Sequence, residues 1–150
     1  MPLVAALACG YAPVRGKPAA GLRVGPVKNG TAQAEAGGIF AAELRRELAG
    51  RGRLSRDGSS DPELSAELVG LNSYPTGVGV EGGAASYHLD AQLRVRAPGY
   101  EDLVAAGDDY LTGVDVLGTE ANRRAALRRV ARAIAAEAIE RYEVSERFSR

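Results

Sequence analysis

Residues 87–96 alternate strictly between apolar and polar side chains, which is the clearest pattern in the chain. Positions 87, 89, 91, 93 and 95 are apolar, and positions 88, 90, 92, 94 and 96 are polar. Because successive side chains of a strand point to opposite faces of a sheet, this pattern predicts a strand with one buried face and one hydrated face.

Three further segments have the character of strands. The segment that starts at Glu63 is apolar at positions 64, 66 and 68, and residues 102–110 predict another strand. A glycine-rich link over residues 77–83 and a turn at positions 98 and 99 connect these strands, so we expect an antiparallel meander. An earlier strand is expected at residues 22–27, where Pro26 lacks the amide donor of a central strand and therefore indicates an edge or a bulge.

Two segments have helical periodicity instead. Residues 34–49 place Phe40, Leu44 and Leu48 on one face, with glycine at positions 50 and 52 to end the helix. A longer helix is expected from an N-cap at Thr119, with Glu120 in its first turn, to Tyr142. Its apolar stripe comprises positions 127, 130, 131, 134, 138, 139 and 142.

The expected order of elements is strand, helix, three strands, helix. Because one face of the sheet is hydrated, both helices are expected on the other face. The pattern therefore predicts an α+β fold, a two-layer sandwich with two helices on one face of a four-stranded mixed or antiparallel sheet.

The composition excludes several classes of function. Nineteen Lys and Arg residues balance nineteen Asp and Glu residues, so no net positive field favours nucleic acid. The single cysteine excludes an internal disulfide and a multi-cysteine zinc site. No apolar run reaches the roughly 18 residues that a membrane-spanning helix needs. No cofactor is expected.

The only cysteine, Cys9, follows an apolar run at residues 3–8. A thiol after small apolar residues near an N-terminus is typical of the acylation site of bacterial lipoproteins. Cys9 is therefore a candidate lipidation site, and a free thiol without a role is the alternative. With lipidation, the chain divides into a residual signal segment (1–8), a lipidated flexible linker (9–20), a single domain (21–144) and a polar tail (145–150).

Catalytic and nucleotide-binding patterns are weak. Residues 77–82 match the letters G-x-G-x-x-G, but strands flank them, whereas a dinucleotide site needs a helix after the loop. His88, the only histidine, lies near Asp90 without a nucleophile motif or further metal ligands and is interpreted as a solvated side chain. Asp108 and Asp109 are neighbours in a strand and point to opposite faces, so they cannot form an acid–base pair.

Two groups of arginines are candidate ligand-binding positions. Positions 123, 124, 128, 129 and 132 are all arginine, and Arg124, Arg128 and Arg132 form a stripe outside the apolar face of the expected last helix. This stripe suits an anionic partner, or it is a solvated face balanced by glutamates at positions 137, 140, 143 and 146. Arg94 and Arg96 lie on the hydrated sheet face, which suits a partner protein or an anionic lipid head group, or is plain solvent-facing sheet.

In this order, the segments resemble the lipopolysaccharide-assembly lipoprotein family, LptE. The resemblance covers the chain from Cys9 to about Tyr142. It rests on Cys9-Gly10-Tyr11, the strand at 22–27, the helical residues 40–48, the amphipathic strand at 87–96 and, most specifically, residues 119–129.

The resemblance implies an outer-membrane lipoprotein, anchored through Cys9, that faces the periplasm and the lumen of a β-barrel. It would plug that barrel, a lipopolysaccharide translocon, and assist its assembly. The implied partners are the barrel, lipopolysaccharide in transit and outer-membrane lipid at the anchor, without catalysis. Some family members contact the glycolipid through basic residues in the hairpin that follows the second strand and just before the last helix. Here residues 77–83 carry only Glu81, and Val116-Leu117-Gly118 precede the expected helix.

Two other functions are alternatives. One is a periplasmic α+β interaction module of another envelope or secretion assembly, with no lipopolysaccharide role. The other is a small hydrolase that uses His88, which we rank last because no nucleophile, base and oxyanion donors converge in the sequence.

Overall fold

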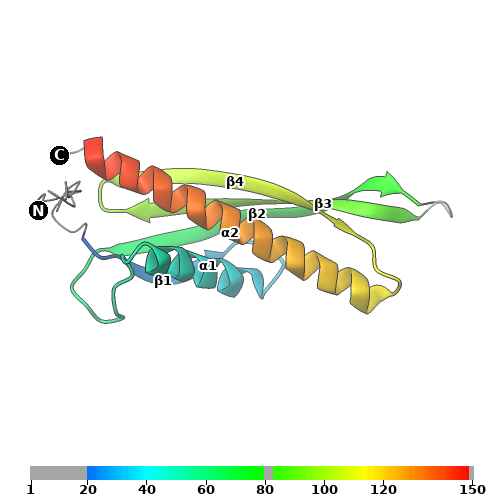
Figure 1. The fold of residues 1–150 in the computed structure, drawn as a ribbon, viewed down its shortest axis with the longest axis horizontal. Helices are drawn as coiled ribbons and strands as arrows, with labels where there is room; N and C mark the ends of the chain where they lie inside the picture. The colour runs from blue at the N-terminus through cyan, green and yellow to red at the C-terminus, as the bar shows by residue number, and fades with distance from the viewer. Residues whose placement is uncertain (1–19, 80–82, 149–150) are drawn as a thin grey trace, which may run out of the picture.

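The computed structural model describes residues 20–79 and 83–148, and six elements follow one another in the predicted order (Figure 1). The elements are β1 (Arg23–Asn29), α1 (Ala36–Gly50), β2 (Glu63–Val78), β3 (Ala84–Ala97), β4 (Tyr100–Leu111) and α2 (Val116–Phe148). The sheet has the order β1-β2-β3-β4, with β1 parallel to β2 and the other neighbours antiparallel. Both helices lie on one face of this mixed sheet. The predicted α+β sandwich is confirmed.

Pro26 explains the geometry of the first strand. Strand β1 lies at the edge of the sheet, and its register with β2 shifts between Val24 and Val27. Pro26 lies within this irregular stretch and is exposed, so its missing amide leaves no gap in a central ladder. Both parts of the prediction, an edge and a bulge, are confirmed.

The core lies between the sheet and the two helices. Phe40, Leu44 and Leu48 of α1 are fully buried, as are Leu89 and Leu93 of β3. All seven predicted apolar positions of α2 are buried too. The periodicity of the sequence therefore identified the face that each element turns to the core, because burying this apolar area is the main stabilising contribution to folding.

Helix α2 begins earlier than predicted. Its first residue is Val116, and the N-cap is Asp115, whose Oδ1 accepts a hydrogen bond from the amide of Gly118 at 2.7 Å. Thr119 lies in the first turn, where its hydroxyl donates to the carbonyl oxygen of Asp115 at 3.0 Å. The predicted cap at Thr119 and the first-turn position of Glu120 are therefore wrong, because Asp115 already satisfies a free amide of the helix start.

Helix α2 also ends later than predicted. It continues past Tyr142 to Phe148, so residues 145–148, expected as part of a polar tail, form its last turn. Glu146 in this turn accepts a hydrogen bond from the Tyr142 hydroxyl at 2.9 Å and lies 2.8 Å from a guanidinium nitrogen of Arg53. These contacts hold residues 145–148 against the domain, although their polar sequence predicts a tail.

Strands β2 and β3 form a long hairpin that projects beyond the helices (Figure 1). Residues 80–82 lie outside the described residues, but strands stand on both sides of the G-x-G-x-x-G letters, as expected. Cys9, the predicted signal segment and the linker up to residue 19 also lie outside the described residues. Neither of the two described helices combines the length and the apolar character needed to cross a bilayer.

Candidate functional site

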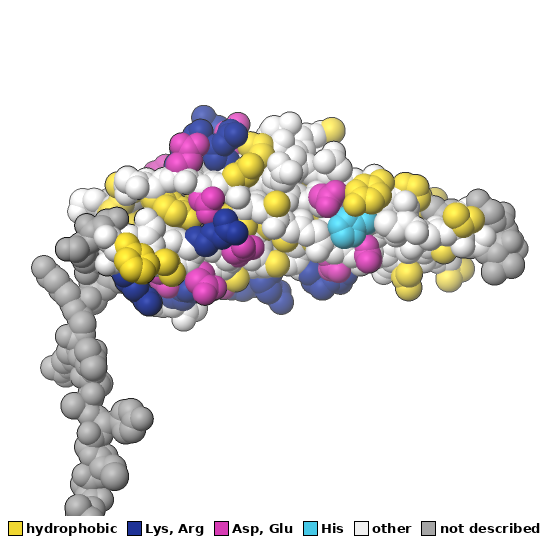
Figure 2. All heavy atoms as spheres, turned by 90° about the horizontal axis from the view of Figure 1, so that it is seen from above, with side chains coloured by type: hydrophobic (Ala, Val, Ile, Leu, Met, Phe, Trp, Pro, Cys, Tyr) yellow, Lys and Arg dark blue, Asp and Glu magenta, His cyan; other side chains and the backbone are white. Residues whose placement is uncertain are grey.

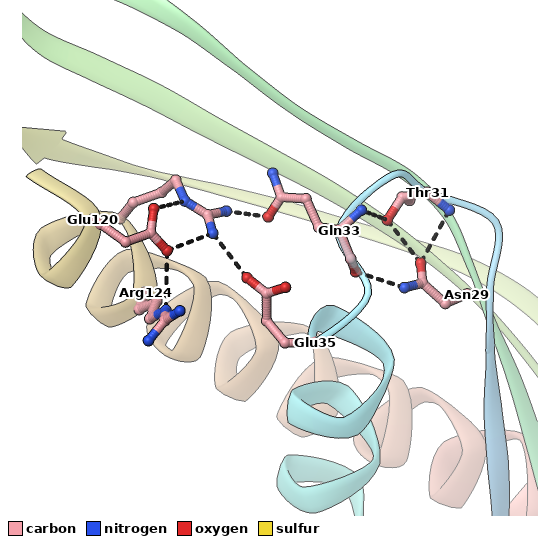
Figure 3. A network of polar contacts seen from close by, with 7 residues as sticks. Asn29, Thr31, Gln33, Glu35, Glu120 and Arg124 are labelled. Atoms are coloured by element: carbon pink, nitrogen blue, oxygen red, sulfur yellow. Dashed lines mark hydrogen bonds and ion pairs between the residues drawn. The ribbon is translucent and has the colours of Figure 1, made fainter. Parts of the chain in front are cut away.

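Only 16% of the Arg123 side chain is accessible, whereas Arg124, Arg129, Arg132 and Arg141 of the same helix are 47–62% accessible. The Arg123 guanidinium donates to Glu120 at 2.8 Å and to Glu35 at 2.9 Å, and it contacts the side-chain oxygen of Gln33 (Figure 3). The hydrogen bond to Glu120 is the main cause of a raised pKa at Arg123, and the same bond lowers the pKa of Glu120.

The loop between β1 and α1, which Arg123 contacts, is held by hydrogen bonds of the Asn29 side chain. The side-chain oxygen of Asn29 accepts hydrogen bonds from the amide and the hydroxyl of Thr31, at 3.0 and 2.7 Å. The side-chain amide of Asn29 donates to the carbonyl oxygen of Gln33 at 2.7 Å (Figure 3). Arg123 therefore joins the start of α2 to the start of α1, and its donors are used within the chain rather than offered to a ligand.

Arg129 is also paired. Its guanidinium bonds the carboxylate of Asp108 and, at 3.3 Å, the carbonyl oxygen of Asp109. The carboxylate of Asp109 lies on the other face of the sheet, against His88. The prediction that the two neighbouring aspartates point to opposite faces is confirmed.

Arg124 and Arg128, the candidate ligand-binding residues of α2, are both exposed. Arg124 donates to Glu120 at 3.0 Å, whereas Arg128 has no partner among residues 20–79 and 83–148. Arg132, one turn further on, lies 3.5 Å from Glu43 of α1. Arg128 is thus the arginine of this stripe whose donors remain available.

Three of the four later glutamates of the same helix form their ion pairs with other arginines. Glu137 pairs with Arg141, and the residues Glu143 and Glu146 pair with Arg51 and Arg53 in the loop after α1. The arginines near the start of α2 instead find carboxylates on α1, on β4 and in their own helical turn. Carboxylates on other elements, and Glu120 in the same part of α2, are therefore the partners of these arginines.

Arg94 and Arg96 lie on the opposite side of the molecule. Arg94 is 3.3 Å from Glu67 of β2, and Arg96 is 3.2 Å from Glu101 of β4. The hydrogen bond from Arg96 lowers the pKa of Glu101. These residues are on the open face of the sheet, so the sandwich separates them from Arg124 and Arg128 instead of joining all four in one site.

His88 is paired rather than freely solvated. Its Nδ1 lies 2.6 Å from Asp109 and its Nε2 lies 3.3 Å from Asp90, and 28% of the side chain is exposed. Figure 2 shows the histidine between acidic side chains on the sheet surface. The hydrogen bond to Asp109 is the main cause of a raised pKa at His88. The direct cross-strand register of His88 and Asp109 produces this pair, which local pattern reasoning missed.

The described residues, 20–79 and 83–148, contain no group of three or more His, Cys, Asp or Glu side chains placed to hold a metal ion. Two buried charged residues, Glu43 and Arg53, went unrecognised in the sequence, where they stand among solvated helix and loop residues. Their burial depends on contacts with α2, and the hydrophobic pattern of the neighbouring residues does not predict such contacts.

The profile of the family described as LptE, Lipopolysaccharide-assembly, matches residues 19–142. No curated protein matches the sequence. Among solved structures, a putative lipoprotein from Caulobacter crescentus is similar, with 14% identity, a TM-score of 0.55 and coverage of 83% of this chain and 93% of the other. The rare lipoprotein B from Shewanella oneidensis is similar with 13% identity, a TM-score of 0.55 and coverage of 83% and 96%. At these identities the two structures support the fold alone.

Proposed function

The chain belongs to the lipopolysaccharide-assembly family LptE, and from this membership we propose that it plugs a β-barrel lipopolysaccharide translocon and assists the assembly of that barrel. The family match over residues 19–142 is the observation that carries the proposal. The family consists of lipoproteins that act in lipopolysaccharide assembly in the Gram-negative envelope. The role as a plug is our inference.

The dimensions of the domain support a place inside a barrel. Helix α2 has 33 residues and therefore rises about 50 Å, at 1.5 Å per residue. A bilayer with its head groups is roughly 40–45 Å thick. A sandwich of this length reaches through the lumen of a large barrel, where it would act as a filler and not as a catalyst.

The surface chemistry is also suited to a lumen. The interior of large outer-membrane barrels is polar. On the open face of this sheet, Arg94 and Arg96 form ion pairs with Glu67 and Glu101, and on the other layer the outer face of α2 carries exposed arginines. Both faces offer hydrogen-bonding groups to a hydrated wall.

We propose that Cys9 carries the lipid anchor and that residues 9–20 form its tether. The carbonyl oxygen of Ala20, the first described residue, accepts a hydrogen bond from Arg53 at 2.8 Å. Arg53 in turn pairs with Glu146 in the last turn of α2. A tether attached at Ala20 would therefore emerge beside the end of α2. The β2–β3 hairpin would lie at the opposite end of the molecule.

Among the candidate ligand contacts, Arg94, Arg96 and Arg124 are paired within the chain, and Arg128 has no partner among the described residues. We therefore expect Arg128 to contribute most to contact with lipopolysaccharide, since its guanidinium breaks no pair with a described residue on binding an anion.

Affinity purification of the tagged full chain from native outer membrane tests the proposal. We expect a β-barrel protein to co-purify in a fixed ratio, and the mass of the N-terminal peptide to include acyl chains on Cys9. An unmodified Cys9, or purification with another envelope assembly while surface lipopolysaccharide stays normal after depletion, would favour the interaction module without a lipopolysaccharide role.

A further inference from the structure

Strand β4 is an edge strand of the sheet and lies beside α2 (Figure 1). The amide of Thr112, directly after β4, donates to the carbonyl oxygen of Ala85 on the β3 side. In an antiparallel pair, successive residues direct their N–H and C=O groups alternately toward the neighbouring strand and away from it. The odd-numbered residues of β4, from 101 to 111, therefore direct these groups to the open edge.

Two carboxylates of β4 cover amides of this edge. Asp102 and Asp108 each accept a hydrogen bond from the amide of the residue that follows, at 2.8 Å in both cases. Each carboxylate also bonds an arginine of α2, Arg141 for Asp102 and Arg129 for Asp108. The helix therefore holds both carboxylates in place, and the two amides are not available to another strand.

Side chains of α2 cover carbonyl oxygens at the far end of the same edge. Asn122 donates to the carbonyl oxygen of Leu111 at 2.9 Å. Arg129 donates to that of Asp109 at 3.3 Å. A further strand that paired with β4 at this end would have to displace these donors, which restricts pairing to the middle of the strand.

The middle of β4 is open. Among residues 20–79 and 83–148, none bonds the outward N–H and C=O groups of Ala105 or Gly107. Both residues are exposed and have small side chains or none, so another backbone can approach them closely. The register of β3 and β4 has no shift, so this stretch is a regular template for an extended segment.

The opposite side of the sheet is less suited to pairing. At the edge of β1, the loop after α1 already pairs with Leu22, Arg45 donates to the carbonyl oxygen of Val24 at 3.2 Å, and Pro26 has no amide. The part of β2 that extends beyond β1 contains Pro75, and its register with β3 shifts directly after this proline. Prolines and register shifts interrupt the regular row of donors that an added strand needs.

A hollow of about 360 Å³ on the open face of the sheet adjoins the middle of β4. Gly70, Gln92 and Ala105 lie side by side in its lining, across three strands. Asp90 is the only charged residue among the described residues of the lining; its side chain is 42% exposed and lies 3.3 Å from Nε2 of His88. At Ala105 only a methyl group separates the edge from the hollow, so a long side chain of an added strand reaches into it.

We propose that the middle of β4 binds an extended segment of a partner protein that places a lysine or arginine beside Ala105. Backbone hydrogen bonds at Ala105 and Gly107 hold the segment, and the cation complements the carboxylate of Asp90 in the hollow. A second copy of β4 is a poorer occupant, because this strand has four acidic residues and no basic one to offer to Asp90. The pairing edge is a property of the sheet and does not depend on the proposed role as a plug.

An NMR titration of the nitrogen-15-labelled full chain tests the pairing. The probe is a short synthetic peptide of alternating threonine and valine with arginine at its centre. We expect the amide signals of Ala105 and Gly107 to shift, and their hydrogen exchange to slow about threefold or more at saturation, because strand addition gives these groups partners. The same peptide, N-methylated along the edge that pairs, is the control and should not bind.

A second peptide with glutamate in place of arginine tests the cation. We expect it to bind about threefold more weakly, the effect of one partly exposed ion pair. Asp90→Asn should abolish this preference and keep the shifts at Ala105 and Gly107. Glu140→Gln is the matched control, since Glu140 is an exposed acidic residue of α2, and it should retain the preference. Asn122→Ala should extend the shifts toward the end of β4.

Unchanged signals at Ala105 and Gly107, or largest shifts in β1 or β2, would overturn the proposed edge. Equal binding of the arginine and glutamate peptides, or a preference that survives Asp90→Asn, would overturn the role of the cation. If the same signals shift with protein concentration alone, a second copy of the chain occupies the edge, and the proposed partner is refuted.

Discussion

A guanidinium nitrogen of Arg53 lies 2.8 Å from the carboxylate of Glu146, joining the loop after α1 to the last turn of α2. Arg53 is 5% exposed, and its guanidinium also donates to the carbonyl oxygen of Ala20 and lies over the ring of Tyr142. One buried side chain thus connects the start of the described chain, the middle and the end.

Replacing Arg53 by alanine is expected to destabilise the domain by about 2–3 kcal/mol, because it strands partly buried carboxylates and an unpaired carbonyl. Chemical denaturation followed by circular dichroism measures the free energy of unfolding. The exposed Arg147→Ala variant should change it by less than about 0.5 kcal/mol. If Arg53→Ala lowers the free energy of unfolding no more than Arg147→Ala does, the contacts of Arg53 do not stabilise the domain.

The network of Arg123 gives a second comparison. Arg123 and Arg124 both bond Glu120, but their side chains are 16% and 55% exposed. We expect Arg123→Ala to cost about 2 kcal/mol, since it also frees Glu35 and Gln33, and Arg124→Ala to cost less than about 0.5 kcal/mol. Equal costs, measured by denaturation of both variants, would contradict this account.

The titration of His88 tests its pair with Asp109. The pair raises the histidine pKa in the folded state, so its contribution to stability is full below the unfolded pKa of about 6.5 and is lost as pH rises through the folded value. Because the chain has one histidine, its ring resonances in an NMR titration are unambiguous. We expect Asp109→Asn to lower the pKa of His88 relative to that in the parent chain.

Asp108→Asn is the control for this titration, because Asp108 faces the helix layer and bonds Arg129. It should leave the His88 pKa nearly unchanged. A larger shift from Asp108→Asn than from Asp109→Asn would refute the assigned pair.

Gly113 permits close packing before α2. A Cβ atom added there would lie 2.5 Å from the carbonyl carbon of Gly118 and 2.6 Å from the amide nitrogen of Thr119, so backbone must shift. Gly113→Ala is expected to cost about 1–3 kcal/mol. Gly50→Ala meets no atom within 4 Å and should be neutral or stabilising, because it reduces the freedom of the unfolded chain. The two melting temperatures, compared with that of the parent chain, check the contrast.

Local patterns predicted the elements well and their ends poorly. The alternation at residues 87–96 and the stripe of α2 placed the buried faces correctly, since strand and helix geometry dictates which side chains share a face. The start of α2 was missed because Asp115 competes with Thr119 as the cap, and its end because Glu146 is held by the distant Arg53. Lipidation of Cys9 stays a prediction.

By itself, the sequence determined the order of the elements, their core faces, the edge position marked by Pro26 and the family. Only the tertiary structure decided how the charges are used. Arg123 binds Glu35, 88 residues away, His88 binds Asp109, and Arg46 shares the buried Glu43 with Arg132. The physical reason is range. Periodicity is fixed by the geometry of a single element, whereas an ion pair forms between whichever groups the packing of several elements brings within a few ångströms.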